Sequence, residues 1–170
     1  MPKGLKETSS LITIGFSVVE SAANTFTQER VDLQLNPLDN EVFVVQAVNL
    51  DPETPDAVAG QNTAVTTSLT TTSRTSIGNL ADSATIANTQ TRIQAAGFVD
   101  GGVGFQLASM ETPPTTMEYI GIISTNDFFV QVQGANNAAA KGVSGKLYGY
   151  RARADSAVYA ALVQSEVLSS

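Results

Sequence analysis

Several stretches of this chain place a hydrophobic residue at every second position, the pattern of a β-strand with one buried face. The clearest is LITIGFSVVE, residues 11–20, where isoleucine, phenylalanine and valine alternate with small or polar residues. Two more, DFFVQVQ (residues 127–133) and KLYGYRARA (residues 146–154), are separated by the small-residue segment GANNAAAKGVSG. The most hydrophobic run, EVFVVQAVNL at residues 41–50, predicts a central strand. Weaker strand patterns cover residues 26–35, 63–75 and 117–124.

The segments between these runs carry turn residues. Proline and glycine mark loops at residues 51–60 and 111–116, and NPLDN marks a turn at residues 36–40. Residues 97–107 predict a tight hairpin around Asp100-Gly101, because both positions of such a turn need positive φ. About eight strands separated by turns favour a sandwich or barrel over alternating strand–helix units.

Two segments depart from the two-residue period. Residues 82–96 predict a short helix, because Asp82 or Ser83 can cap it. Ile86 and Ile93 then lie seven positions apart on one face. The tail from Asp155 fits either a capped helix or a last strand. As a helix, the tail has a stripe formed by Val158, Leu162 and Ser165. As a strand, it has Ala157, Tyr159 and Ala161 facing inward.

Length and charge indicate one domain with a rather neutral surface. The chain has 170 residues, and only 15% of them are charged. Much of the polar surface must come from Ser, Thr, Asn and Gln, which suit contact with neighbouring subunits as well as with water. The net charge of −7 argues against direct recognition of nucleic acid, and no run approaches the roughly 18 apolar residues of a membrane helix. We expect an N-terminal arm at residues 1–10 and a single domain at residues 11–170.

The amino-acid composition excludes most catalytic mechanisms. Cys, His and Trp are all absent, which excludes disulfides, thiolate nucleophiles, and Ser-His-Asp and Cys-His catalysis. A carboxylate pair is enough for glycoside hydrolysis, but the candidates Asp39, Glu41 and Asp127 lie in turns or at strand ends. We therefore expect neither an enzyme nor a bound cofactor.

The sharpest carboxylate cluster is Asp51, Glu53 and Asp56, in the loop at residues 51–60. Loop carboxylates supply the oxygen ligands that calcium prefers. Their spacing matches no EF-hand, because the required glycine and the distal glutamate are missing. The simpler interpretation is a solvated loop, so we expect no metal and keep these three residues as the candidate ligands.

Four basic residues are the candidates for subunit contacts. Arg151 and Arg153 share one face of the strand at residues 146–154, where they either meet solvent or pair with acids of a neighbouring copy. Lys3 and Lys6 lie in the arm MPKGLKETSS, which has almost nothing to bury. We expect neighbouring subunits to hold this arm in place.

Five strands resemble those of a viral coat protein of the single jelly-roll type. They are LITIGFSVV, EVFVVQAVNL, MEYIGIIS, DFFVQVQ and KLYGYRARA, with connections such as TAVTTSLTTTSRTS and GANNAAAKGVSG. The C-terminal third also resembles small virion proteins of marine phage type. The resemblance implies an all-β fold, an antiparallel β-sandwich with a jelly roll of about eight strands and one or two short helices at most. It also implies a homo-oligomer in the capsid lattice of a virion, alone or with other virion proteins.

Other functions stay open. A basic arm of the kind that single-stranded RNA viruses often carry is missing, so an acidic coat fits a double-stranded DNA virus better. A trimeric decoration or receptor-binding fibre protein of a phage is one alternative, and a secreted adhesin is another. An adhesin needs an export signal. The first 24 residues imitate one weakly, but polar residues at every second position of the hydrophobic run indicate a strand.

Overall fold

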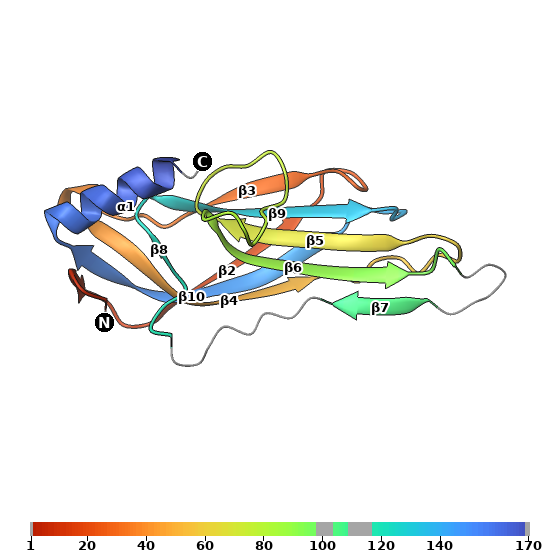
Figure 1. Ribbon diagram of the computed structural model, residues 1–170, viewed down its shortest axis with the longest axis horizontal. Coiled ribbons are helices and arrows are strands. Elements are labelled where there is room, and N and C mark those ends of the chain that lie inside the picture. The colour runs from red at the N-terminus through yellow and green to blue at the C-terminus, as the bar shows by residue number, and fades with distance from the viewer. Residues whose placement is uncertain (1, 98–103, 109–116, 169–170) are drawn as a thin grey trace.

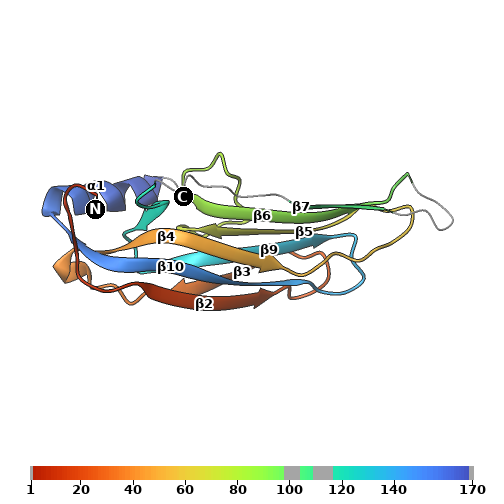
Figure 2. The same ribbon diagram turned by 90° about the horizontal axis from the view of Figure 1, so that it is seen from below.

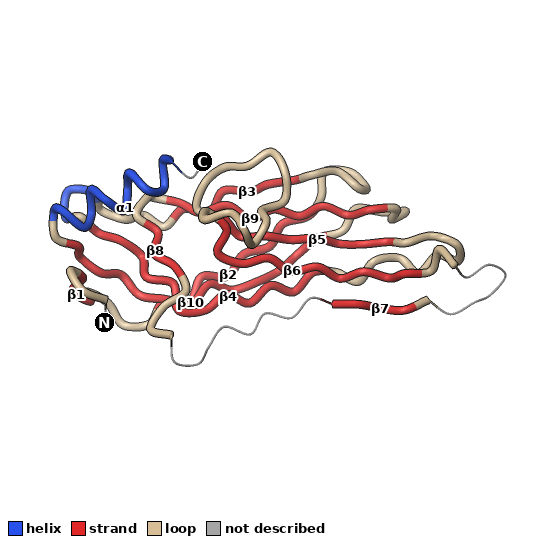
Figure 3. Tube along the Cα trace, viewed as in Figure 1, coloured by secondary structure: helices blue, strands red, loops and turns tan. Residues whose placement is uncertain are grey.

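In its described residues the protein forms two antiparallel β-sheets packed face to face, with one α-helix confined to one end (Figure 1; Figure 3). This computed structural model describes residues 2–97, 104–108 and 117–168. Sheet A contains β1 (Leu5–Glu7), β2 (Ile12–Val19), β4 (Glu41–Pro52), β8 (Gly121–Ile123) and β10 (Gly142–Ala154). Sheet B contains β3 (Thr27–Asp32), β5 (Thr63–Thr70), β6 (Thr85–Gln94), β7 (Phe105–Ala108) and β9 (Asp127–Ala135). The predicted all-β antiparallel sandwich is therefore confirmed.

The strand order is that of a jelly roll. With β1 and β7 set aside, the remaining strands pair first with last along the chain: β2 with β10, β3 with β9, β4 with β8, and β5 with β6. This pairing arises when one long hairpin is rolled up so that its strands are shared between two sheets. In Figure 2 the long strands of both sheets run along the same direction, with β2, β4 and β10 of sheet A on one side of the sandwich. β10 forms the centre of sheet A, since it pairs with β1, β2 and β4.

The core between the sheets is built from the inward positions of the alternating strands. Phe43 and Leu147 enter it from sheet A, and Leu69 and Phe128 enter it from sheet B. Burial of each such side chain stabilises the fold by about 1.5–3 kcal/mol. Phe16 of β2 meets Phe128 edge to face, with ring centroids 5.9 Å apart and an interplanar angle of 72°.

Helix α1 (Ser156–Leu168) covers the outer face of sheet A at one end of the sandwich, here called the helix end. Tyr159 and Leu162 pack against Val42 and Val44 of β4, so β4 is buried on both faces. This double burial explains why EVFVV is hydrophobic at successive positions. No helix within the described residues is long and apolar enough to span a membrane.

Of the two alternatives for the tail, the helix is observed. The Oδ1 atom of Asp155 accepts the backbone N–H of Val158 at 2.9 Å, which is the expected cap. Part of the predicted arm is a short strand, because β1 pairs with the C-terminal end of β10 in sheet A of the same chain. The role of residues 1–10 as an arm in an assembly stays a prediction.

The helix predicted at residues 82–96 is wrong, because residues 85–94 form strand β6 between β5 and β7. Its register passes from Leu69 opposite Ala87 to Thr70 opposite Thr85, so Ile86 is the extra residue of a β-bulge. The bulge lets Ile86 pack on the core beside buried Ala87. Isoleucines seven positions apart therefore do not require a helix here, and the β-branched residues of the segment favour a strand.

Other boundaries differ from the prediction or lie outside the described residues. The strand predicted at residues 117–124 is shorter, because only residues 121–123 pair with β4. The predicted turn at Asp100-Gly101 and the loop at residues 111–116 lie outside the described residues.

Candidate functional site

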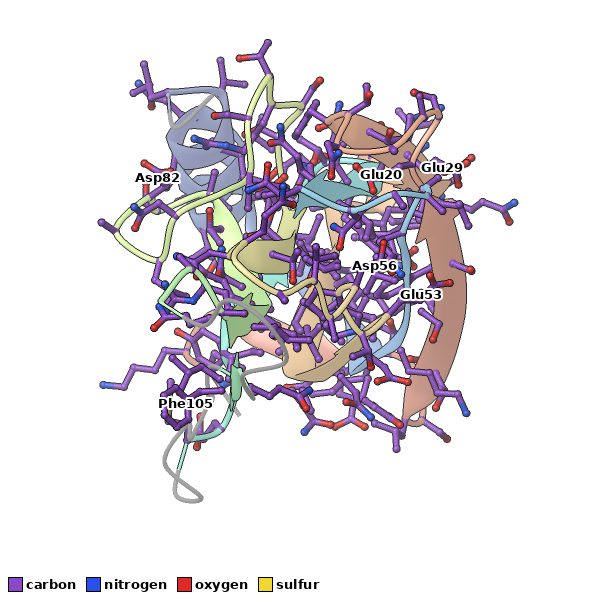
Figure 4. All side chains as sticks on the ribbon, turned by 90° about the vertical axis from the view of Figure 1, so that its right-hand side faces the viewer. Glu20, Glu29, Glu53, Asp56, Asp82 and Phe105 are labelled. Atoms are coloured by element: carbon purple, nitrogen blue, oxygen red, sulfur yellow. The ribbon has the colours of Figure 1, made fainter. Side chains whose placement is uncertain are left out.

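The three carboxylates considered as a metal site do not converge. They lie at the end of the sandwich opposite α1, here called the loop end, which carries the connections 20–26, 53–62 and 136–141 (Figure 4). Asp51 and Glu53 are exposed, whereas Asp56 is partly buried. Across residues 2–97, 104–108 and 117–168, no three acidic, His or Cys side chains lie close enough together to hold a metal ion.

Asp56 binds its own chain instead. Its Oδ1 atom accepts a hydrogen bond from Nζ of Lys141 at 2.8 Å, and its Oδ2 atom accepts the backbone N–H of Ala138 at 2.7 Å. These bonds, the lysine's first, lower the pKa of Asp56 from its ordinary value. The ion pair therefore ties the connection 53–62 to the connection 136–141 at neutral pH.

Glu20, directly after β2, is a buried carboxylate that sequence reasoning missed. Its side chain is only 4% exposed. Oε2 accepts the backbone N–H of Gly134, and Oε1 accepts that of Lys141, both at 2.9 Å. One side chain thus holds both ends of the connection 136–141. Hydrogen bonds to a charged group contribute about 1.5–3 kcal/mol each.

Two asparagines complete the loop-end network, which we define as Glu20, Asn24, Asp56, Asn137 and Lys141. The backbone N–H of Asn137 donates to Oδ1 of Asn24 at 2.9 Å, and Nδ2 of Asn24 donates to the Asn137 carbonyl at 3.0 Å. Oδ1 of Asn137 accepts the backbone N–H of Asp56 at 2.9 Å. Three connections far apart in sequence are thereby fixed together. The exposed residues around the network include Ala22, Ala57, Ala59, Ala138 and Ala139.

A second network fastens the connection 71–84 over the outer face of sheet B. Gln131 is fully buried, and its Oε1 atom accepts a hydrogen bond from Oγ of Ser68 at 2.6 Å. Its Nε2 atom donates to Oε1 of Gln28 at 2.9 Å. Oγ of Ser68 in turn accepts the backbone N–H of Gly78 at 2.9 Å, so the connection is bonded to the sheet beneath it.

Arg151, predicted at a subunit contact, is occupied within its own chain. Its guanidinium donates to the backbone carbonyls of Leu33 and Gln34 at 2.9 and 3.0 Å, and to Oε1 of Glu41 at 2.8 Å. These bonds tie β10 to the connection that follows β3. Arg151 therefore has less capacity left for a neighbouring subunit than a solvated arginine has.

The other three predicted contact residues are exposed at the helix end. Nη2 of Arg153 lies 3.5 Å from Oδ1 of Asp39, and the two side chains are 59% and 52% exposed. Lys6 lies opposite Arg153 in the β1–β10 register, and Lys3 precedes β1 in a turn. Their contact with another subunit stays a prediction.

The helix end also contains an apolar groove of about 260 Å³, here called the helix-end groove. Its walls include Leu35, Pro37, Tyr159 and Val163. Ser124 also lines it, and Oγ of that residue is buried with no hydrogen-bond partner among the described residues. The groove is built from segments far apart in the chain, so no local sequence pattern indicates it.

Comparisons with protein-family models, with curated proteins and with solved structures found no match to this chain.

Proposed function

We propose that this protein is the major capsid subunit of a virus particle and self-assembles into an icosahedral shell. The observation that carries the proposal is the jelly-roll strand order, with connections held by buried side chains at both ends. A shell subunit must present the same contact surfaces in every copy. Connections that are already fixed lose less entropy when copies associate.

The surface supports the same proposal. Large exposed hydrophobic side chains lie at both ends of the sandwich, where they are available for contact with neighbouring copies. They include Leu38 and Leu168 towards the helix end, and Val19, Val58 and Phe105 towards the loop end. Because only 15% of the residues are charged, burying such surfaces costs little desolvation energy. The partners in this proposal are further copies of the chain and other virion proteins, and the role is structural.

Assembly of the full-length protein tests the proposal. Sedimentation velocity over a concentration series, followed by electron microscopy of the fastest species, should reveal closed shells of uniform diameter. A discrete trimer that never closes would favour the decoration or fibre-protein alternative. A protein that stays monomeric at every concentration would contradict both.

A further inference from the structure

We propose that two copies of this chain associate about a two-fold axis, with Leu38 of each copy inserted into the helix-end groove of the other. This inference rests on the proposed function, because it names one contact through which shell subunits join. It concerns a groove that the alternation of the strands did not indicate, and it includes Arg153, one of the candidate contact residues.

Leu38 is the inserted group. It is 92% exposed, the highest value among the large hydrophobic residues described. It sits on a 3-10 turn, η1 (Pro37–Asp39), in which Oδ1 of Asn36 accepts the Leu38 N–H at 3.0 Å. The N–H of Asn40 closes the turn on the Pro37 carbonyl at 3.2 Å. A single exposed leucine is ordinary, but one held on a capped turn loses little entropy when it binds.

The receiving groove lies beside that turn. Pro37, directly before Leu38, is itself one of the lining residues, as are Tyr159 and Val163 of α1. Ser124 is 4% exposed, and its hydroxyl has no hydrogen-bond partner within the described part of the chain. A buried hydroxyl without a partner is costly, so this part of the groove is not fully satisfied by the described residues alone.

Charge favours a second copy of the chain as the occupant. The one Asp, Glu, Lys or Arg in α1 is Glu166, which is buried and accepts the backbone N–H groups of Ser124 and Thr125. The helix wall of the groove therefore shows no exposed charge, and Glu41, the charged residue that does line the groove, is paired with Arg151. Asp39 and Arg153 lie beside Leu38, 3.5 Å apart and more than half exposed.

A two-fold axis brings the leucine, the groove and the charge pair of both copies into one contact. Because Leu38 and the groove are neighbours on one end, a single two-fold axis places each leucine against the other copy's groove. The same axis brings the pair Asp39 and Arg153 face to face with its own image, so each charge can meet its opposite. Each copy then contributes the same leucine, the same groove and the same charge pair to the contact.

The first experiment compares Leu38→Asp with Leu80→Asp in the full-length protein. Leu80 is 67% exposed, lies in the connection 71–84, and does not line the groove. By sedimentation velocity, Leu38→Asp should raise the dimer dissociation constant ~10- to 100-fold, since burial of a leucine is lost. Leu80→Asp should leave this constant unchanged.

The outcomes separate the inference from the proposed function. Shells formed equally well by Leu38→Asp and wild type overturn the inference and leave shell building intact. Wild-type dimers that never close, and that Leu38→Asp abolishes, support the inference and contradict shell building. A wild-type protein that is monomeric at every concentration overturns both.

The second experiment uses the absence of cysteine in the chain. Protein carrying Leu38→Cys is mixed with protein carrying Val163→Cys under mild oxidation, after circular dichroism has shown that each variant keeps the wild-type spectrum and melting midpoint. A disulfide-linked heterodimer containing one of each is expected, whereas Leu80→Cys with Val163→Cys should yield none. Failure of the Leu38–Val163 cross-link in a sample that still associates would overturn the proposed geometry.

Discussion

Replacing Glu20 by alanine should destabilise the protein by about 2–5 kcal/mol. The carboxylate accepts the N–H groups of Gly134 and Lys141, both at 2.9 Å, and is 4% exposed. The Gly134 N–H is buried, so its loss of an acceptor carries the full desolvation penalty of about 1–3 kcal/mol. The Lys141 N–H is partly accessible, so water replaces part of its bond, and the loss there is about 1–2 kcal/mol.

Urea unfolding followed by far-ultraviolet circular dichroism measures this loss. With a slope of about 2 kcal/mol per molar urea, the midpoint for Glu20→Ala should fall by about 1–2.5 M. Glu20→Gln keeps one acceptor oxygen, so its midpoint should fall by roughly half as much. The matched control is Glu29→Ala, an exposed glutamate of β3 labelled in the same view (Figure 4), which should change stability by about 0.5 kcal/mol at most. Equal midpoints for Glu20→Ala and Glu29→Ala would refute the reasoning.

Three further predictions concern other parts of the fold. The pKa of Asp56 is lowered in the folded state, so the stability from its ion pair is present above the ordinary pKa of 3.8 and is lost as the pH falls through the folded value. Urea midpoints measured at decreasing pH should show a loss that Asp56→Asn removes. Glu166→Ala should cost about 2–4 kcal/mol and speed hydrogen exchange in α1, because two backbone N–H groups after β8 lose their acceptor; unchanged exchange in α1 would contradict this. Gly149→Ala should cost about 3 kcal/mol in thermal or urea unfolding, since its Cβ would lie 2.2 Å from a carbonyl oxygen of β4. Gly15→Ala is the control, because no atom lies within 4 Å of its Cβ, and similar stabilities of the two variants would count against the packing argument.

Alternation predicted the strands well because it reports a local property, which side of the backbone is buried. β2 shows this directly, since its hydrophobic positions pack on the core and its polar positions face outward. The order of the strands is not local. Val19 pairs with Gly142, and no pattern within either segment indicates that partner. The expectation of a jelly roll rests on the joint resemblance of several strands to those of single jelly-roll coat proteins.

The error at residues 82–96 and the missed Glu20 have the same origin. The bulge at Ile86 changes the face on which the later residues lie, and only the partner strand reveals it. Glu20 follows a strand, where a carboxylate is typical of a solvated turn, and its two partners lie 114 and 121 positions away. Asp56 is recognisable from the sequence as an acid in a loop, but its lysine is 85 positions distant.

The central place of β10 constrains how the chain is made. Within the described residues β2 is bonded to sheet A only through β10, so it has no strand to join until residues 142–154 leave the ribosome. A nascent chain consequently carries an incomplete sheet whose bare edges invite aggregation, and chaperones are suited to shield it. Sheet A therefore cannot be completed before residues 142–154 have emerged.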